Sequence, residues 1–222
     1  MDGWGGFFLA LGVFYAVHAL PVRPGVKAAG QARLGSRGYA AVTGLVQLAT
    51  LAWVIVAAGQ APWIGLWDQA PWMRWAVNLA MPVAVALVVL AIGTPNPLSF
   101  GGPAAGFDPA RPGLAGLVRH PVLWALLLWS SAHMLVNGDL AHVLLFGGFA
   151  LFSALGMVVL DRRRQRDLGA DWARLAAHTS NLPLAGRLAG WRPSPARLVV
   201  AAAIWLALLW LHPEVIGVSP LP

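Results

Sequence analysis

The sequence predicts an all-α polytopic membrane protein, built as a six-helix transmembrane bundle with an irregular third loop and a cytoplasmic amphipathic helix. The first observation is composition: of 222 residues, 59% are hydrophobic and 10% are charged, whereas a soluble domain carries about 25% charged residues. The second is that the basic residues lie between long apolar runs. This pattern excludes a disordered tail, a disulfide-stapled secreted domain and a nucleic-acid-binding protein.

Six apolar runs predict the membrane spans, because a helix rises ~1.5 Å per residue and the hydrocarbon core is ~30 Å thick. We expect one integral-membrane domain, residues 1–222, with spans at about 4–20, 39–58, 75–92, 122–136, 140–160 and 198–211. The fourth and sixth runs are short, so their helices should run upright, begin earlier or lie where the bilayer is thin. The first run lacks a preceding basic segment, which favours a retained helix over a cleaved signal peptide.

The distribution of basic residues predicts the orientation of the chain, because cytoplasmic loops carry an excess of Lys and Arg. Every Lys and Arg except Arg74 falls in the first, third or fifth loop. Both termini are therefore expected on the outer side of the membrane, in the periplasm or its equivalent. Trp63, Trp67 and Trp72 fit an aromatic belt at the outer interface.

Two loops are long enough to form more than a turn. The third, residues 93–119, is rich in Gly and Pro and is expected to be irregular. In the fifth, residues 161–197, the spacing of Leu168, Trp172, Leu175 and Ala176 predicts an amphipathic helix on the membrane surface. The arginines of residues 162–166 serve either as a positive-inside anchor or as a site for an anionic headgroup, a phosphate or a haem propionate.

Histidines within the spans are the most informative residues, because an ionisable group at membrane depth is costly. His18 lies in the first span on the same helical face as Phe14, and His133 lies in the fourth span one turn after Trp129. Each is either a neutral imidazole bonded to a backbone carbonyl or a serine, or a ligand or proton relay. The chain has no cysteine, so a metal site would use His, carboxylate or thioether groups.

Other histidines lie at the span ends. His120 begins the fourth span in the tripeptide Arg119, His120, Pro121, and His212 ends the sixth. No carboxylate lies within a span, which disfavours a proton-coupled transporter. No P-loop, GxGxxG, HExxH or GxSxG pattern is present, so no motif of a soluble enzyme suggests a different function.

Five segments in order resemble the NnrU family and cover nearly the whole chain. They read FYAVHALPVRP, TPNPLSFGG, GLVRHPVLWALLLWSSAHMLVNGD, DRRRQRDLGADWARLAAHTSNLPLAG and LHPEVIGVSP. Members of this family are bacterial inner-membrane proteins associated with denitrification, and they are similar to the plant zeta-carotene isomerase, a haem b membrane enzyme. The resemblance thus implies a multi-pass inner-membrane protein with a haem b site.

The resemblance also implies which residues hold the haem. His18 and His133 match the two axial iron ligands of the isomerase, and Arg119 and His120 of the shared RHP are expected to contact the cofactor. Ser130 stands where the isomerase has a Cys, so a thiol ligand switch is not implied. Helix rise alone favours His18 with His120, or His133 with His212, at equal depth. We retain His18 and His133, because an unpartnered imidazole costs most inside a span.

A second likeness leaves other functions open. The RHP and the later LGxxW segment are similar to isoprenylcysteine and phospholipid methyltransferases, although Arg166 and Asp167 stand where those enzymes carry a Glu. We therefore expect a haem b protein with a redox, sensing or maturation role in nitrogen-oxide respiration. The alternatives are an S-adenosylmethionine-dependent methyltransferase, a haem-dependent isomerase of a lipophilic small molecule, and a cofactor-free structural helper.

Overall fold

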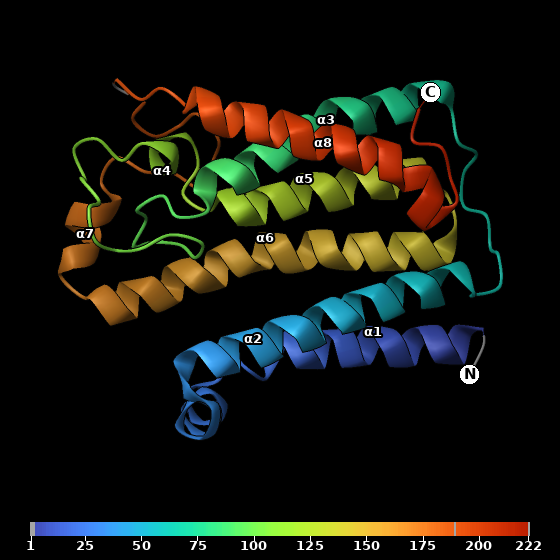
Figure 1. Cartoon of the computed structure of the whole chain (residues 1–222), viewed down its shortest axis with the longest axis horizontal. Coiled ribbons are helices and arrows are strands. Elements are labelled where there is room, and N and C mark those ends of the chain that lie inside the picture. Colours follow the sequence, from blue (N-terminus) through green and yellow to red (C-terminus); the bar gives the residue numbers. More distant parts are fainter. Residues whose placement is uncertain (1–2, 189, 222) are drawn as a thin grey trace. The chain divides into compact units, whose positions relative to one another are not determined.

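The computed structural model describes residues 3–188 and 190–221, and this part of the chain is helical with irregular connections (Figure 1). No β-strand forms within it, and an isolated bridge joins Gly65 to Asp139. The all-α class predicted from the sequence is confirmed. The helices are α1 (Trp4–Ala19), α2 (Pro24–Gly59), α3 (Pro71–Ala91), α4 (Leu114–Leu117), α5 (Pro121–Val136), α6 (Leu140–Leu168), α7 (Asp171–Ala176) and α8 (Pro195–Ile216).

Four helices, α2, α3, α6 and α8, are long and apolar enough to cross a membrane, and α1 and α5 are shorter apolar helices of 16 residues each. Large apolar side chains on the long helices face outward, such as Leu79 at 71% and Trp210 at 75% exposure. A soluble protein rarely tolerates so much exposed apolar surface. The chain is therefore a membrane protein whose exterior suits a lipid bilayer.

Proline marks the beginning of most long helices. Pro24, Pro71, Pro121 and Pro195 are the first residues of α2, α3, α5 and α8. Proline suits this position because its fixed φ matches the helix and its missing N–H would have no helical partner there. These residues mark where each of these helices begins.

The chain forms two compact units. The N-terminal unit comprises Met1–Asp68 and Asn137–Leu145, and the C-terminal unit comprises Gln69–Val136 and Phe146–Pro222. In the N-terminal unit α1 packs against α2. Helix α2 begins at Pro24, well before the predicted span at residue 39, and it is interrupted at Gly35, where φ is 68° and ψ is 168°.

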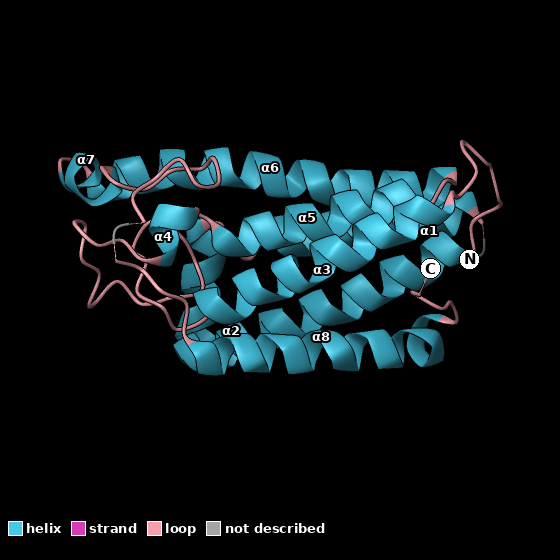
Figure 2. Ribbon diagram, turned by 90° about the horizontal axis from the view of Figure 1, so that it is seen from above, coloured by secondary structure: helices cyan, strands magenta, loops and turns pink. Residues whose placement is uncertain are grey.

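In the C-terminal unit α3 packs against both α5 and α8, as Figure 2 shows. A buried cluster of small and branched side chains joins α3, α4 and α5: Ala84, Leu87, Leu90, Ala91, Leu114, Val118 and Ala125. The irregular connections, with α4 and α7, gather where α5 begins and α6 ends (Figure 1). This end of the C-terminal unit carries the polar residues described below.

Helix α6 extends to Leu168, beyond the predicted span end at residue 160. Its final turns contain Arg and Gln, which are good helix formers, so the helix continues after the apolar run stops. Gly169, with φ of 53°, follows α6. The single amphipathic helix predicted from Leu168 to Ala176 does not form as one element: Leu168 ends α6, and a separate helix of 6 residues, α7, begins at Asp171.

Candidate functional site

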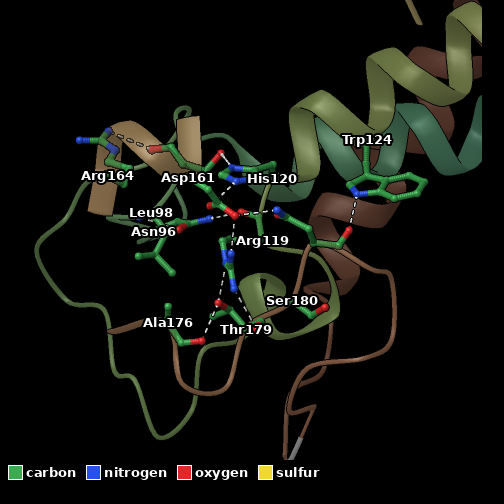
Figure 3. A network of polar contacts seen from close by, with 12 residues as sticks. Asn96, Leu98, Arg119, His120, Trp124, Asp161, Arg164, Ala176, Thr179 and Ser180 are labelled. Carbon is green, nitrogen blue, oxygen red and sulfur yellow. Dashed lines mark hydrogen bonds and ion pairs between the residues drawn. The ribbon is translucent and has the colours of Figure 1, made fainter. Parts of the chain in front are cut away.

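A polar network lies where α5 begins and α6 ends, within the C-terminal unit. Arg119 and His120 directly precede Pro121, the first residue of α5. Asp161 is the first residue after the apolar part of α6. Because both helix ends lie together, the two basic side chains meet this carboxylate (Figure 3).

Asp161 is the acceptor at the centre of the network. Its Oδ1 accepts from His120 Nε2 at 2.9 Å, and its Oδ2 accepts from Arg119 Nη1 and from Asn181 Nδ2, each at 2.6 Å. The Asp161 and Arg119 side chains are each 13% exposed and that of His120 is 0% exposed. A carboxylate with so little solvent access needs such donors to remain charged.

His120 also contacts Ser99, whose Oγ lies 3.0 Å from Nδ1. Because the carboxylate only accepts, Nε2 carries a hydrogen, and the other ring nitrogen is occupied by the serine hydroxyl. Ser99, His120 and Asp161 thus form one hydrogen-bonded chain. Ser99 is only 2% exposed, and a nucleophile must contact its substrate. This chain therefore positions the helix ends and does not form a hydrolytic triad.

Arg119 connects the helix ends to the segment after α7. Its Nε donates to Thr179 Oγ1 at 2.8 Å and its Nη2 donates to the Thr179 carbonyl at 3.2 Å. The guanidinium lies 5.2 Å from the centre of the Trp172 ring, close enough for a cation–π contact. The Arg119 carbonyl accepts from Asn96 Nδ2 at 3.0 Å. One side chain and its backbone thus hold the third loop, α5 and α7 together.

Two buried polar atoms in this region, Asn181 Oδ1 and Arg164 Nε, have no hydrogen-bond partner among the described residues. The Arg164 Nη2 donates to the Ser99 carbonyl at 3.4 Å, a long hydrogen bond. Buried polar groups are normally paired because leaving one unpaired costs free energy. A further group could therefore donate a hydrogen bond to Asn181 Oδ1, and another could accept one from Arg164 Nε.

The two histidines predicted as iron ligands share one hydrogen-bond pattern. His18 Nδ1 donates to the Phe14 carbonyl and His133 Nδ1 donates to the Trp129 carbonyl, each at 2.8 Å. A carbonyl only accepts, so Nδ1 carries a hydrogen in both rings, and in the neutral form of a histidine the acceptor nitrogen is then Nε2. This is the tautomer in which a histidine binds a metal through Nε2.

Aromatic rings contact both imidazoles. The Phe14 ring centre lies 4.0 Å from that of His18. The ring centres of Trp129 and Phe146 lie 5.5 Å and 5.3 Å from that of His133. These neighbours are the apolar surroundings in which a flat aromatic cofactor packs favourably.

The structure brings two of the predicted site residues together, because Arg119 and His120 share Asp161. His133 lies in the last turn of α5, so nearly the whole helix separates it from His120. His18 belongs to the N-terminal unit, and His212 Nδ1 donates to the Val218 carbonyl at 2.7 Å.

No group of three or more His, Asp or Glu side chains that could hold a metal ion occurs in the described part of the chain. A haem with two axial protein ligands needs only a pair of such side chains, so this finding does not test His18 and His133 as ligands. Their assignment to iron stays a prediction.

Sequence reasoning missed most partners in the polar network. Asp161 directly follows the apolar run, so the sequence pattern places it with the charges of the fifth loop, and the pattern assigns no role to Ser99, Thr179 or Asn181. The available signal was the scarcity of acids: the chain has 8 Asp and Glu residues. An Asp at the end of a predicted span, such as Asp161, is a reasonable partner for the Arg119 and His120 side chains of the RHP tripeptide.

These helices and this network define a helical membrane protein with a buried polar joint at one end of its C-terminal unit. A family model described as NnrU protein matches residues 6–220. The chain belongs to the NnrU family. Comparison with curated proteins and with solved structures found no match.

Proposed function

We propose that this NnrU-family chain is a haem b-binding protein of the bacterial inner membrane, with His18 and His133 as axial ligands. It would cross the membrane six times with both termini in the periplasm. Its role would be in redox chemistry, sensing or maturation during nitrogen-oxide respiration. The observation that carries the proposal is the common tautomer of the two histidines, which are set by carbonyls four residues earlier.

His120 is a weaker candidate for the iron. Both of its ring nitrogens are hydrogen-bonded, one to a carboxylate, and its side chain is fully buried. Binding iron would break one of these bonds and leave a buried group unpaired, which costs about 1–3 kcal/mol. We propose that Arg119 and His120 position the ends of α5 and α6. Their contact to a haem propionate stays a prediction.

The aromatic neighbours have a defined part in the proposal. Haem b supplies a one-electron redox centre when it is bound. Phe14, Trp129 and Phe146 would exclude water from the imidazoles, and the backbone carbonyls of residues 14 and 129 would hold each ring in place. These residues set ring orientation and local polarity, which are the protein's means of tuning a haem.

The test is the haem content of detergent-purified protein, measured from its Soret band per mole of chain. We expect His18→Ala and His133→Ala each to abolish the band or shift it to that of a five-coordinate haem, and His120→Ala to retain it. His178→Ala is the matched control for loss of a histidine outside a span. Adding imidazole should restore the spectrum of His18→Gly or His133→Gly, which a merely misfolded variant would not show.

Two results would contradict the proposal. If His120→Ala abolished haem binding and His133→Ala left it intact, the ligand assignment would be wrong. If the wild-type chain stayed colourless after incubation with hemin, haem binding itself would be wrong. Binding of S-adenosylmethionine would then favour the methyltransferase alternative, and binding of neither would favour the cofactor-free helper.

A further inference from the structure

The loop between α7 and α8 presents two leucines to its surroundings. Leu182 is 68% exposed and Leu184 is 69% exposed, although both follow a segment anchored in the polar network. Leu184 has φ of 65°, a left-handed conformation that costs a residue with a Cβ about 1 kcal/mol. Its N–H donates to the Leu117 carbonyl at 2.8 Å. The fold therefore holds this apolar side chain outward at a cost.

A shallow hollow of about 360 Å³ is lined in part by the residues that directly follow Leu184 in the chain. It is lined by Ala177, His178, Thr179, Ala185, Gly186 and Arg187. The Arg187 N–H donates to the His178 carbonyl at 2.9 Å, which joins the two lining segments. A Cβ at Gly186 would lie 2.5 Å from the Gly116 carbonyl oxygen, so the close backbone approach requires glycine. The hollow therefore has a firmly packed backbone wall.

The charge at this hollow is positive and uncompensated. The three acids of the fifth loop are engaged elsewhere: Asp161 with Arg119, Asp167 with Arg163 and Asp171 with Arg174. No carboxylate among the described residues pairs with Arg187. A guanidinium and an imidazole at the edge of a hollow suit a phosphate group, which accepts several charge-assisted hydrogen bonds.

We propose that this hollow binds the phosphate of an anionic phospholipid headgroup, while Leu182 and Leu184 insert among the acyl chains beside it. The pairing of apolar and cationic side chains is the reason for choosing a lipid. A soluble phosphate would use Arg187 and His178 but would leave the two exposed leucines unexplained. Polybasic segments gain about 1 kcal/mol per Lys or Arg at an anionic membrane surface. The inference does not depend on haem binding.

The headgroup is tested with detergent-purified protein and short-chain phosphatidylglycerol, with bound lipid counted by native mass spectrometry. We expect Arg187→Gln to weaken binding about fivefold, the equivalent of one surface arginine. Arg174→Gln is the matched control, because Arg174 lies in the same loop, is 62% exposed and already pairs with Asp171. Equal loss in both variants would overturn a specific site. Competition by inorganic phosphate as strong as by the lipid would overturn the choice of a lipid.

The insertion of the leucines is tested by spin labelling. Because the chain has no cysteine, the label attaches only to the cysteine that is introduced. Leu182→Cys and Leu184→Cys are labelled with a nitroxide in vesicles containing phosphatidylglycerol. We expect both labels to collide more often with lipid-soluble oxygen than with a water-soluble nickel chelate. Ala110→Cys, in the exposed part of the third loop, should show the opposite preference. If labels at 182 and 184 preferred the nickel chelate, the insertion would be wrong.

Discussion

At the scale of single residues, Asp161 shows how one carboxylate can organise a helix end. It accepts hydrogen bonds from Arg119, His120 and Asn181. A buried ion pair contributes little net stability over an apolar replacement, but breaking it by removing one partner leaves an uncompensated charge. The role of Asp161 is therefore to keep Arg119 in place, so that the segments that Arg119 contacts stay together.

Asp161→Asn should destabilise the C-terminal unit, because Arg119 would lose its anionic partner while remaining 13% exposed. We expect a loss of roughly 2–4 kcal/mol in the free energy of unfolding, near the range for broken buried pairs. Thermal unfolding in detergent, followed by circular dichroism, measures it.

The matched control is Asp108→Asn, which removes a similar ion pair to Arg111 from the surface. Exposed pairs contribute at most about 1 kcal/mol. If both variants unfolded at the same temperature as the wild type, the network would not stabilise this end of the protein.

At the scale of elements, the interruption in α2 is the clearest departure from a regular helix. Gly35 has φ of 68° and ψ of 168°, and helical residues lie on both sides of it. Figure 1 shows the first turns of α2 at an angle to the remainder. The basic residues Arg33 and Arg37 flank the break. A glycine is needed here because a side chain strains a backbone with positive φ.

Gly35→Ala should lower the free energy of unfolding by about 1–2 kcal/mol, or straighten the helix. Gly44→Ala is the control, because Gly44 is helical and a Cβ there meets nothing within 4 Å. Alanine at that position should stabilise by about 1 kcal/mol. The rate of limited trypsin cleavage after Arg33 and Arg37 measures any change in structure at the break. An equal change in this rate for the two substitutions would contradict a structural need for glycine at position 35.

Another element-scale contact joins α8 to α3. The Arg197 guanidinium donates to the Leu90 carbonyl at 2.9 Å and to Thr94 Oγ1 at 2.7 Å. The carbonyls at the end of a helix lack helical partners, so a cation there is favourable. This contact supplements the few buried residues of α8, of which Ala201 is one.

At the scale of the whole molecule, the outward apolar side chains and the placement of charge suit a protein surrounded by lipid. Large exposed hydrophobic residues occur on each of the four long helices, for example Leu45, Leu79, Leu155 and Trp210. The polar joint of the C-terminal unit lies at the end bearing most of its arginines. The positive-inside rule predicts that this end faces the cytoplasm.

Reporter fusions test the proposed topology. Alkaline phosphatase fused after Leu221 should be active, because the C-terminus is expected in the periplasm. A fusion after Arg166 should be inactive, since this position follows the apolar part of α6 on the cytoplasmic side. An inactive fusion after Leu221 together with a fluorescent cytoplasmic reporter there would mean that the number of spans is odd.

Sequence patterns are enough to predict the all-helical class, the membrane environment and the NnrU family. These properties follow from local patterns, since the length of an apolar run and a proline at a helix start act on neighbouring residues. The pairing of His18 and His133 with carbonyls four residues earlier is equally local. A sequence reader could expect these contacts from helix geometry alone.

The polar joint and the exposed loop are visible only in the folded chain. Ser99, His120, Asp161 and Asn181 come from four separate segments, and nothing in their sequence spacing brings them together. The outward position of Leu184 likewise depends on the distant carbonyl of Leu117. The partner of a buried charge or a strained residue depends on which segments folding brings near it, and a local pattern does not contain that information.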